Sequence, residues 1–429
     1  MTLHVRFRIS ISLKGFLLLA IFAAPQPAFT QLINGRFYPE KQNYVVGEPV
    51  IVVLEIQNQS SKNLYFPSSS CTDLFSGQFI IENAPPKHET SLYSCVPGAE
   101  LVDCLIGSEE VPAEGVYRKR LLLEGNFNLN SPGRYHVRGN RDISLHDTDR
   151  LDLDNSKDPG IDLNISSEFD IYLRSPEPGE LEAAISTFLN DLESEDVEAQ
   201  ALAAEAIAQN PPTWTEPNLI SMANDPFVDN SAILGLDHLG TPAARAKLWD
   251  MARTPTRPDG GQPEIGALGE IGNPEDCVPM LALARASKDY TQAEAYIMAG
   301  RICKEDAVGP LSSLLGVDNS QLLTGVSGGL ANTASRDAVS PLIAMLLNPQ
   351  VNARQDAADA LEKLTHFESN FGVEDDAAAQ RTFDAWTNWW SSNEKTAPIF
   401  GADSCAPPQP LPGTPSVLPP NSRYSRYIR

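Results

Sequence analysis

Histidines are the residues of this chain best suited to acid–base or metal chemistry, and their spacing matches no catalytic or metal-binding motif. Five of the six follow the N-terminal segment at scattered positions, His88, His136, His146, His238 and His366. The chain has no H-E-x-x-H, no G-x-S-x-G and no phosphate-binding glycine loop. We therefore expect no catalytic, cofactor-binding or metal-binding residues, and we interpret His238 as an ordinary interhelical or surface histidine.

An acidic loop is predicted in "DTDRLDLDNSKDPGID", from Asp147 to Asp162. Its oxygens could hold a hard cation such as calcium, although the glycine and the glutamate of an EF-hand are missing. A solvated loop is the preferred interpretation, and a calcium site is the alternative.

Cysteines indicate disulfides if the chain is exported, since their spacing is no metal motif. Cys71, Cys95 and Cys104 cluster in a loop-rich stretch, where Cys95 with Cys104 is the favoured pair. Cys405, near the C-terminus, has no assigned partner.

Three tryptophans gather near the C-terminus in "RTFDAWTNWWSS". Trp386, Trp389 and Trp390 lie on one side of a predicted helix, with Phe383 one turn before them. We predict a capping helix that covers the open apolar face of a last repeat, and an aromatic ligand platform is the alternative.

An internal repeat supplies the elements that position these residues. Prolines recur with a spacing of 31 residues in "EDCVPMLALA", "EDAVGPLSSLL" and "RDAVSPLIAML", at Pro279, Pro310 and Pro341. A proline inside an apolar helical pattern belongs in the first turn, where backbone N–H groups have no helical partner. The pattern therefore predicts three helices that begin near these prolines, and "ILGLDHLGTPAARAKLWDMA" adds a similar unit upstream.

Residues just before the prolines bear on the helix caps. Asn273 and Ser335 lie six residues before their prolines, where a side-chain oxygen can accept from free N–H groups, whereas Lys304 at the same place cannot. Cys277 and Cys303 occupy apolar positions of adjacent repeats, and we predict two plain core residues rather than a bridge.

The repeats resemble those of the HEAT family, in particular the short repeats of bilin-lyase-like proteins. The resemblance rests on "ALGEIGNPEDCVPMLALA" and on "VNARQDAADALEKLTH", whose apolar, basic and small positions are Val351, Arg354, Ala357, Ala358 and Leu361. It covers roughly Pro178 to Asn393 and implies an all-α solenoid of stacked repeats. Such arrays serve mostly as binding surfaces.

Upstream of the repeats the sequence predicts strands. Apolar and polar residues alternate around Val50, Val52, Leu54 and Ile56, and "RKRLLLEGNFNLNSPGRYHVRGNRDI" reads as two strands about a Ser-Pro-Gly turn. "VGEPVIVVLEIQN" and "LNSPGRYHVRG" resemble strands of the immunoglobulin-like modules of bacterial exported proteins, which implies an all-β sandwich.

The N-terminus has the pattern of a secretory signal: Arg6, Arg8 and Lys14 precede the apolar run Gly15 to Ala24, which is too short to span a membrane. We expect a signal peptide at 1–30, an immunoglobulin-like sandwich at 31–174, a HEAT-like solenoid at 175–395 and a Pro-rich disordered tail at 396–429. The boundary is expected at "SPEPGE", between Arg174 and Leu181.

The charge of the chain limits its partners. The formal net charge is −24, and residues 175–244 contain thirteen Asp or Glu and no Lys or Arg. Nucleic acid and anionic membranes are therefore poor partners, because both require clustered positive charge. We predict an exported, periplasmic or extracellular, non-catalytic scaffold that binds a protein, basic if charge guides the contact. The alternative is an enzyme or enzyme subunit, bilin-lyase-like or metal-dependent, that uses the Asp147–Asp162 loop.

Overall fold

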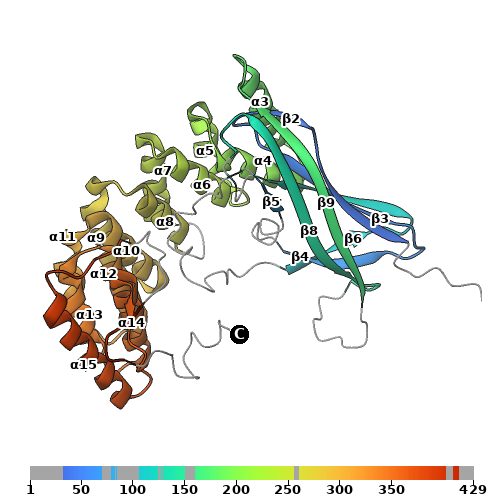
Figure 1. Cartoon of the computed structure of the whole chain (residues 1–429). Helices are drawn as coiled ribbons and strands as arrows, with labels where there is room; N and C mark the ends of the chain where they lie inside the picture. Colours follow the sequence, from blue (N-terminus) through green and yellow to red (C-terminus); the bar gives the residue numbers. More distant parts are fainter. Residues whose placement is uncertain are drawn as a thin grey trace, which may run out of the picture.

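Strands come first in this molecule and helices follow. The computed structural model describes residues 32–69, 79–82, 84, 106–123, 127, 129–149, 160–255, 260–401 and 409–414. Within these ranges a β-rich part precedes a part of thirteen α-helices, and about half of the described residues are helical. Figure 1 shows the long strands on one side and the helices following one another in a curved row as far as α15. The predicted signal peptide lies outside the described residues.

Nine strands build the β-rich part. Three sheets have the strand orders β1-β3-β7, β2-β9-β8-β5 and β4-β6. Their pairs are antiparallel except β2 with β9, which run parallel. The strands are β1 (Ile33–Pro39), β2 (Asn43–Val45), β3 (Ile51–Asn58), β4 (Leu64–Ser69), β5 (Phe79–Ile81), β6 (Ile106–Val111), β7 (Gly115–Leu122), β8 (Gly133–Leu145) and β9 (Ile161–Arg174).

One hydrophobic core joins these sheets. The even-numbered apolar residues of β3 point into it, as their alternation predicts, together with side chains of β1, β5, β8 and β9. The opposite face of β3 is buried as well, which the alternation does not predict. Its Glu55 is only 2% exposed and is held by Arg36 and Arg118 at 2.8 Å each. These two hydrogen-bonded guanidinium groups keep the pKa of Glu55 low in spite of its burial.

Thirteen helices form the rest of the described chain. They are α3 (Glu180–Asp191), α4 (Val197–Gln209), α5 (Glu216–Met222), α6 (Asp229–Leu239), α7 (Pro242–Arg253), α8 (Gln262–Ile271), α9 (Cys277–Ala286), α10 (Asp289–Cys303), α11 (Glu305–Ser312), α12 (Ser320–Asn332), α13 (Val339–Met345), α14 (Val351–Thr365) and α15 (Asp376–Asn393). No helix of the described residues is long and apolar enough to cross a membrane.

Two of the three expected helix starts have the expected form. Asn273 and Ser335 accept hydrogen bonds from backbone N–H groups two residues on, and each opens a short 3-10 turn before α9 or α13. Pro279 and Pro341 are then the third residues of these helices, inside the first turn.

The third helix start differs. Pro310 is the sixth residue of α11, so its placement in a first turn was wrong. Lys304 cannot cap with its side chain and takes φ 51°, which lets α11 begin directly at Glu305 without the 3-10 turn of the other two units. The proline therefore falls one turn later in this helix.

The even-numbered helices from α4 to α14 contact one another in succession and form one layer. Small residues let α10 and α12 approach closely. A Cβ added at Gly300 would lie 1.9 Å from the carbonyl oxygen of Gly329, and one added at Gly325 would lie 2.4 Å from the Cα of Ala293.

The strands and the helices share a buried junction. Ile51, at the start of β3, belongs to the hydrophobic core of the helices and is 1% exposed. Arg120 of β7 lies 3.6 Å from Asp191 of α3, and Arg174 of β9 lies 2.6 Å from Glu180. The segment between the last strand and the first of these helices is Ser175–Gly179, all of it exposed.

Part of the expected disordered tail is ordered. Gln409–Pro410 form β11, which pairs in parallel with β10 (Phe367–Glu368) after α14. Leu411 is buried in the core of the helices. Residues 409–414 are ordered because a backbone pairing and one apolar anchor tie this segment down.

Candidate functional site

The described histidines are not brought together with a nucleophile or with one another. His136 Nδ1 lies 3.1 Å from Asp170 at the surface of the strands, and Arg134 and His136 hold the pKa of that carboxyl below its usual range. His238 Nδ1 lies 2.8 Å from the carbonyl oxygen of Ala208, and His366 is buried beside the ring of Phe400. His88 lies outside the described residues.

The acidic loop Asp147–Asp162 is described only at its two ends. Residues 150–159 lie outside the described residues, and the described flanks are occupied by ordinary contacts. Asp147 is 3.0 Å from Lys62, and Asp162 accepts a hydrogen bond from Ser144. No group of three or more His, Cys, Asp or Glu side chains with metal-binding geometry occurs in the part of the chain that is described.

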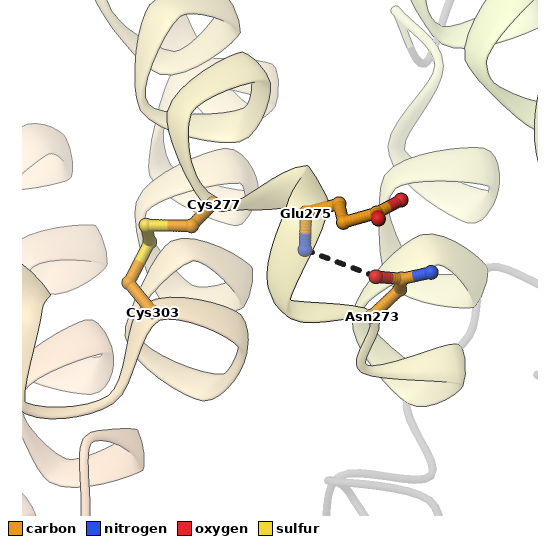
Figure 2. The surroundings of a disulfide bond; sticks show 4 residues. All are labelled: Asn273, Glu275, Cys277 and Cys303. Atoms are coloured by element: carbon orange, nitrogen blue, oxygen red, sulfur yellow. Dashed lines mark hydrogen bonds between the residues drawn. A yellow bond between two sulfur atoms is a disulfide. The ribbon is translucent and has the colours of Figure 1, made fainter.

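Cys277 and Cys303 form a disulfide, so the prediction of two plain core residues was wrong. The bond joins the first residue of α9 to the last residue of α10, as Figure 2 shows beside the Asn273 cap. Antiparallel packing of these neighbouring helices brings their ends to a Cα–Cα distance of 4.9 Å, within disulfide range. A bridge between the repeats was the less favoured interpretation, because the sequence does not show how closely the two helix ends approach. Cys71, Cys95, Cys104 and Cys405 lie outside the described residues.

The helix layer carries a row of polar side chains at equivalent positions of successive units. Successive members are 32, 31, 31 and 31 residues apart, and we call them the ladder: His238, Glu270, Arg301, Asn332 and Lys363. Each is one turn or less from the end of its helix, on α6, α8, α10, α12 and α14 respectively. The same 31-residue frame that locates the prolines therefore locates a second, polar row.

Hydrogen bonds link most rungs of the ladder to a neighbouring helix. Arg301 donates to Glu270 at 2.7 Å, and Lys363 donates to Asn332 at 3.1 Å. The Asn332 amide also donates to the carbonyl oxygen of Ile297, at 3.3 Å. These bonds fix the side chains across successive helices, so the row is a set of positioned groups rather than freely rotating surface residues.

Beside the ladder, one turn earlier on α6, α8, α10 and α12, lies a row of small and aliphatic residues that we call the floor: Leu234, Gly266, Ile297 and Gly328. All four are half-buried. On α14 the equivalent residue is Asp359. Three exposed apolar residues near the starts of α4, α6 and α10 form what we call the rim: Val197, Phe227 and Tyr290, with exposed fractions of 55%, 52% and 70%. Phe227 and Tyr290 lie seven residues before the floor residues Leu234 and Ile297. Ladder and floor lie on the same face of their helices, because residues four positions apart lie on the same side of a helix. Of the rim, Val197 and Tyr290 lie in the first turns of α4 and α10, and Phe227 lies in the turn just before α6.

Asp237 lies next to the ladder residue His238 and has a shifted pKa. Burial and the neighbouring Glu270 raise its pKa to about 7, although Arg301 acts in the opposite direction. The carboxyl therefore changes charge near neutral pH. The face as a whole offers hydrogen-bonding side chains, an uncharged strip and exposed apolar groups, which is what an extended polypeptide requires for binding.

Comparisons with known proteins give no family for this chain. No protein-family model matches it, and no curated protein matches it. The solved structures that match include BslA, a bacterial hydrophobin, with 10% sequence identity, a TM-score of 0.15 and coverage of 34% of this chain and 96% of that chain. A likeness this weak carries no argument.

Proposed function

We propose that the β-rich part is an immunoglobulin-like sandwich, that the helices form a HEAT-like solenoid, and that the protein is a non-catalytic scaffold of the bacterial cell envelope. The observation that carries the proposal is the recurrence of ladder and floor residues at equivalent positions of successive helices, with the exposed rim residues near the starts of α4, α6 and α10. A repeated face of this kind suits an extended protein partner, because successive units place side chains at a regular spacing along it.

The disulfide supports export. Structural disulfides persist in oxidising compartments and are rare in the cytosol of most organisms. Together with the N-terminal charge and apolar pattern, the Cys277–Cys303 bond favours a periplasmic or extracellular location. Cell fractionation with mass measurement of the mature chain tests this, and an intact N-terminus with reduced Cys277 and Cys303 in the cytosol would contradict it.

The charge of the helical part favours a basic partner. Residues 176–395 contain 34 Asp or Glu against 13 Lys or Arg. Opposite charge on a partner raises the association rate at low ionic strength, and added salt screens the effect. We therefore expect association with the partner to slow as salt increases from about 20 to 150 mM.

A pull-down from envelope extract with the full mature chain tests the binding face. The double variant Phe227→Ala/Tyr290→Ala removes two exposed rim side chains with little expected effect on stability, since both are more than half exposed. We expect it to lose a partner that the unchanged chain retains. Val278→Ala is the matched control, because Val278 is 76% exposed on α9, outside this layer. Equal loss in both variants, or in neither, would overturn the assignment of the face.

A further inference from the structure

A hollow of about 550 Å³ lies between α15 and the ordered part of the C-terminal segment, away from the ladder. One wall is a stripe along α15 that runs over three turns, Arg381, Asp384, Ala385, Asn388, Trp389, Ser392 and Asn393. Phe371, Pro412 and Gly413 complete the lining. Several of these side chains are exposed, so the hollow is open to solvent.

The Pro412–Gly413 wall is fixed by the fold. Leu411, directly before it, is 1% exposed, and its N–H donates to the carbonyl oxygen of Glu368. Thr414 N–H donates back to the carbonyl oxygen of Leu411, and Gly413 takes φ 87°. This is a type II turn with proline and glycine at their preferred places, which holds the wall in one conformation.

Polar groups of the lining have unused hydrogen-bonding capacity within the described residues. The Asn388 side-chain amide makes no hydrogen bond there, and Arg381 lies over the ring of Phe371 at 5.9 Å without an ion pair. Asp384 uses one oxygen to accept from Gln380, and Asn393 uses its amide nitrogen to donate to the carbonyl oxygen of Trp389. Donors and acceptors are thus both available, beside two aromatic rings.

We infer that this hollow binds a saccharide of about two rings. Sugar hydroxyls donate and accept at once, which matches the mixture of guanidinium, carboxylate and amide groups. The apolar C–H groups of a pyranose pack against the apolar side chains of the lining, Phe371, Trp389 and Pro412. The positive charge of Arg381 disfavours a simple cation, and the negative charge of Asp384 disfavours a simple anion. The volume of the hollow is that of a site for a small ligand.

Titration calorimetry of the full mature chain with cellobiose, maltose and the β-1,4 disaccharide of N-acetylglucosamine tests the inference. We expect saturable binding of at least one, with a Kd of about 1 mM, as suits an open site with few contacts. Sorbitol, an acyclic polyol without a ring face, should not bind. Absence of saturable binding of all three disaccharides up to about 30 mM would overturn the inference.

Variants localise the binding. Asn388→Ala should raise the Kd about five-fold, the effect of one neutral hydrogen bond, and Phe371→Ala should raise it further. Phe371→Tyr keeps a ring and should retain binding. Thr387→Ala is the matched control, because Thr387 is exposed on α15 but does not line the hollow. Binding that survives both Asn388→Ala and Phe371→Ala would place the saccharide elsewhere and refute the site, and it would leave the rim variants of the proposed function untouched.

Discussion

At the scale of single residues, Glu362 on α14 is the carboxyl that most clearly couples stability to pH. Burial and the nearby Asp359 and Glu368 raise its pKa to about 8. A carboxyl whose pKa is higher in the folded chain than in the unfolded chain holds an extra proton in the folded state between those two values. The free energy of unfolding therefore falls as pH rises from about 4.5 to about 8.

Replacing Glu362 with Gln removes this penalty. We expect the variant to gain about 1 to 2 kcal/mol at pH 8, since one pKa unit corresponds to about 1.4 kcal/mol and partial exposure reduces the effect. Urea unfolding at pH 5 and pH 8 measures the change. Glu195→Gln, at an exposed site, is the control and should shift neither curve. Equal stability of Glu362→Gln and the unchanged chain at pH 8 would contradict the prediction.

The disulfide also acts at this scale. Its sequence separation is 26 residues, and closing a loop of that length removes enough entropy from the unfolded chain to stabilise the fold by about 3 to 4 kcal/mol. The double variant Cys277→Ala/Cys303→Ala should lose about that amount in urea unfolding. A loss of less than about 1 kcal/mol in the free energy of unfolding would mean that the disulfide constrains the unfolded chain little.

At the scale of elements, close contact of α10 and α12 depends on glycine. A Cβ at position 300 would overlap the backbone of Gly329, which no side-chain rotation can relieve. Gly300→Ala should therefore cost about 2 to 3 kcal/mol in the free energy of unfolding. Gly309→Ala on α11 is the matched change, because no described heavy atom would lie within 4 Å of its Cβ. It should stabilise by about 0.5 to 1 kcal/mol through helix propensity, and a loss of stability in both variants would refute the argument.

Packing between elements also involves α15, through its buried tryptophans. Trp386 is 1% exposed and is the largest of the fully buried side chains, and its ring lies 5.5 Å from that of Trp389 in an edge-to-face contact. Trp386→Ala should cost about 3 to 5 kcal/mol in urea unfolding, the range for loss of a buried large aromatic residue. A change within about 0.5 kcal/mol would instead indicate that this helix contributes little to the core.

Local patterns predicted the elements better than the contacts between them. The 31-residue frame located the helices, and side-chain chemistry located the caps of Asn273 and Ser335. Pro310 does not lie in a first turn because α11 begins directly after Lys304, whose backbone has φ 51°. Residue propensities do not predict this conformation. The ladder was visible in the same frame, whereas the hollow on α15 was not, because its far wall comes from a Pro-rich segment without apolar periodicity.

At the scale of the whole molecule, the junction of strands and helices decides whether they act as separate units. The sequence predicted a boundary at an exposed linker, yet residues of β3 belong to two different cores. Ile51 belongs to the core of the helices, and Leu54 belongs to the core of the strands. Arg120 adds a polar tie, since it lies 3.0 Å from Glu40 and 3.6 Å from Asp191 of α3. No periodicity of the sequence indicates these contacts, because they join segments about 70 residues or more apart.

Two truncations on β3 test this coupling. Ile51→Ala and Leu54→Ala each remove a buried aliphatic side chain, at a cost of about 2 to 5 kcal/mol. If the junction joins the two parts, Ile51→Ala should increase hydrogen exchange in α3 and α4 more than Leu54→Ala does, although both residues lie on the same strand. Leu54→Ala should act mainly on β1, β8 and β9, whose side chains share its core. Unchanged exchange in α4 after Ile51→Ala would mean that the strands and the helices open independently, and that the linker at Ser175–Gly179 is a true domain boundary.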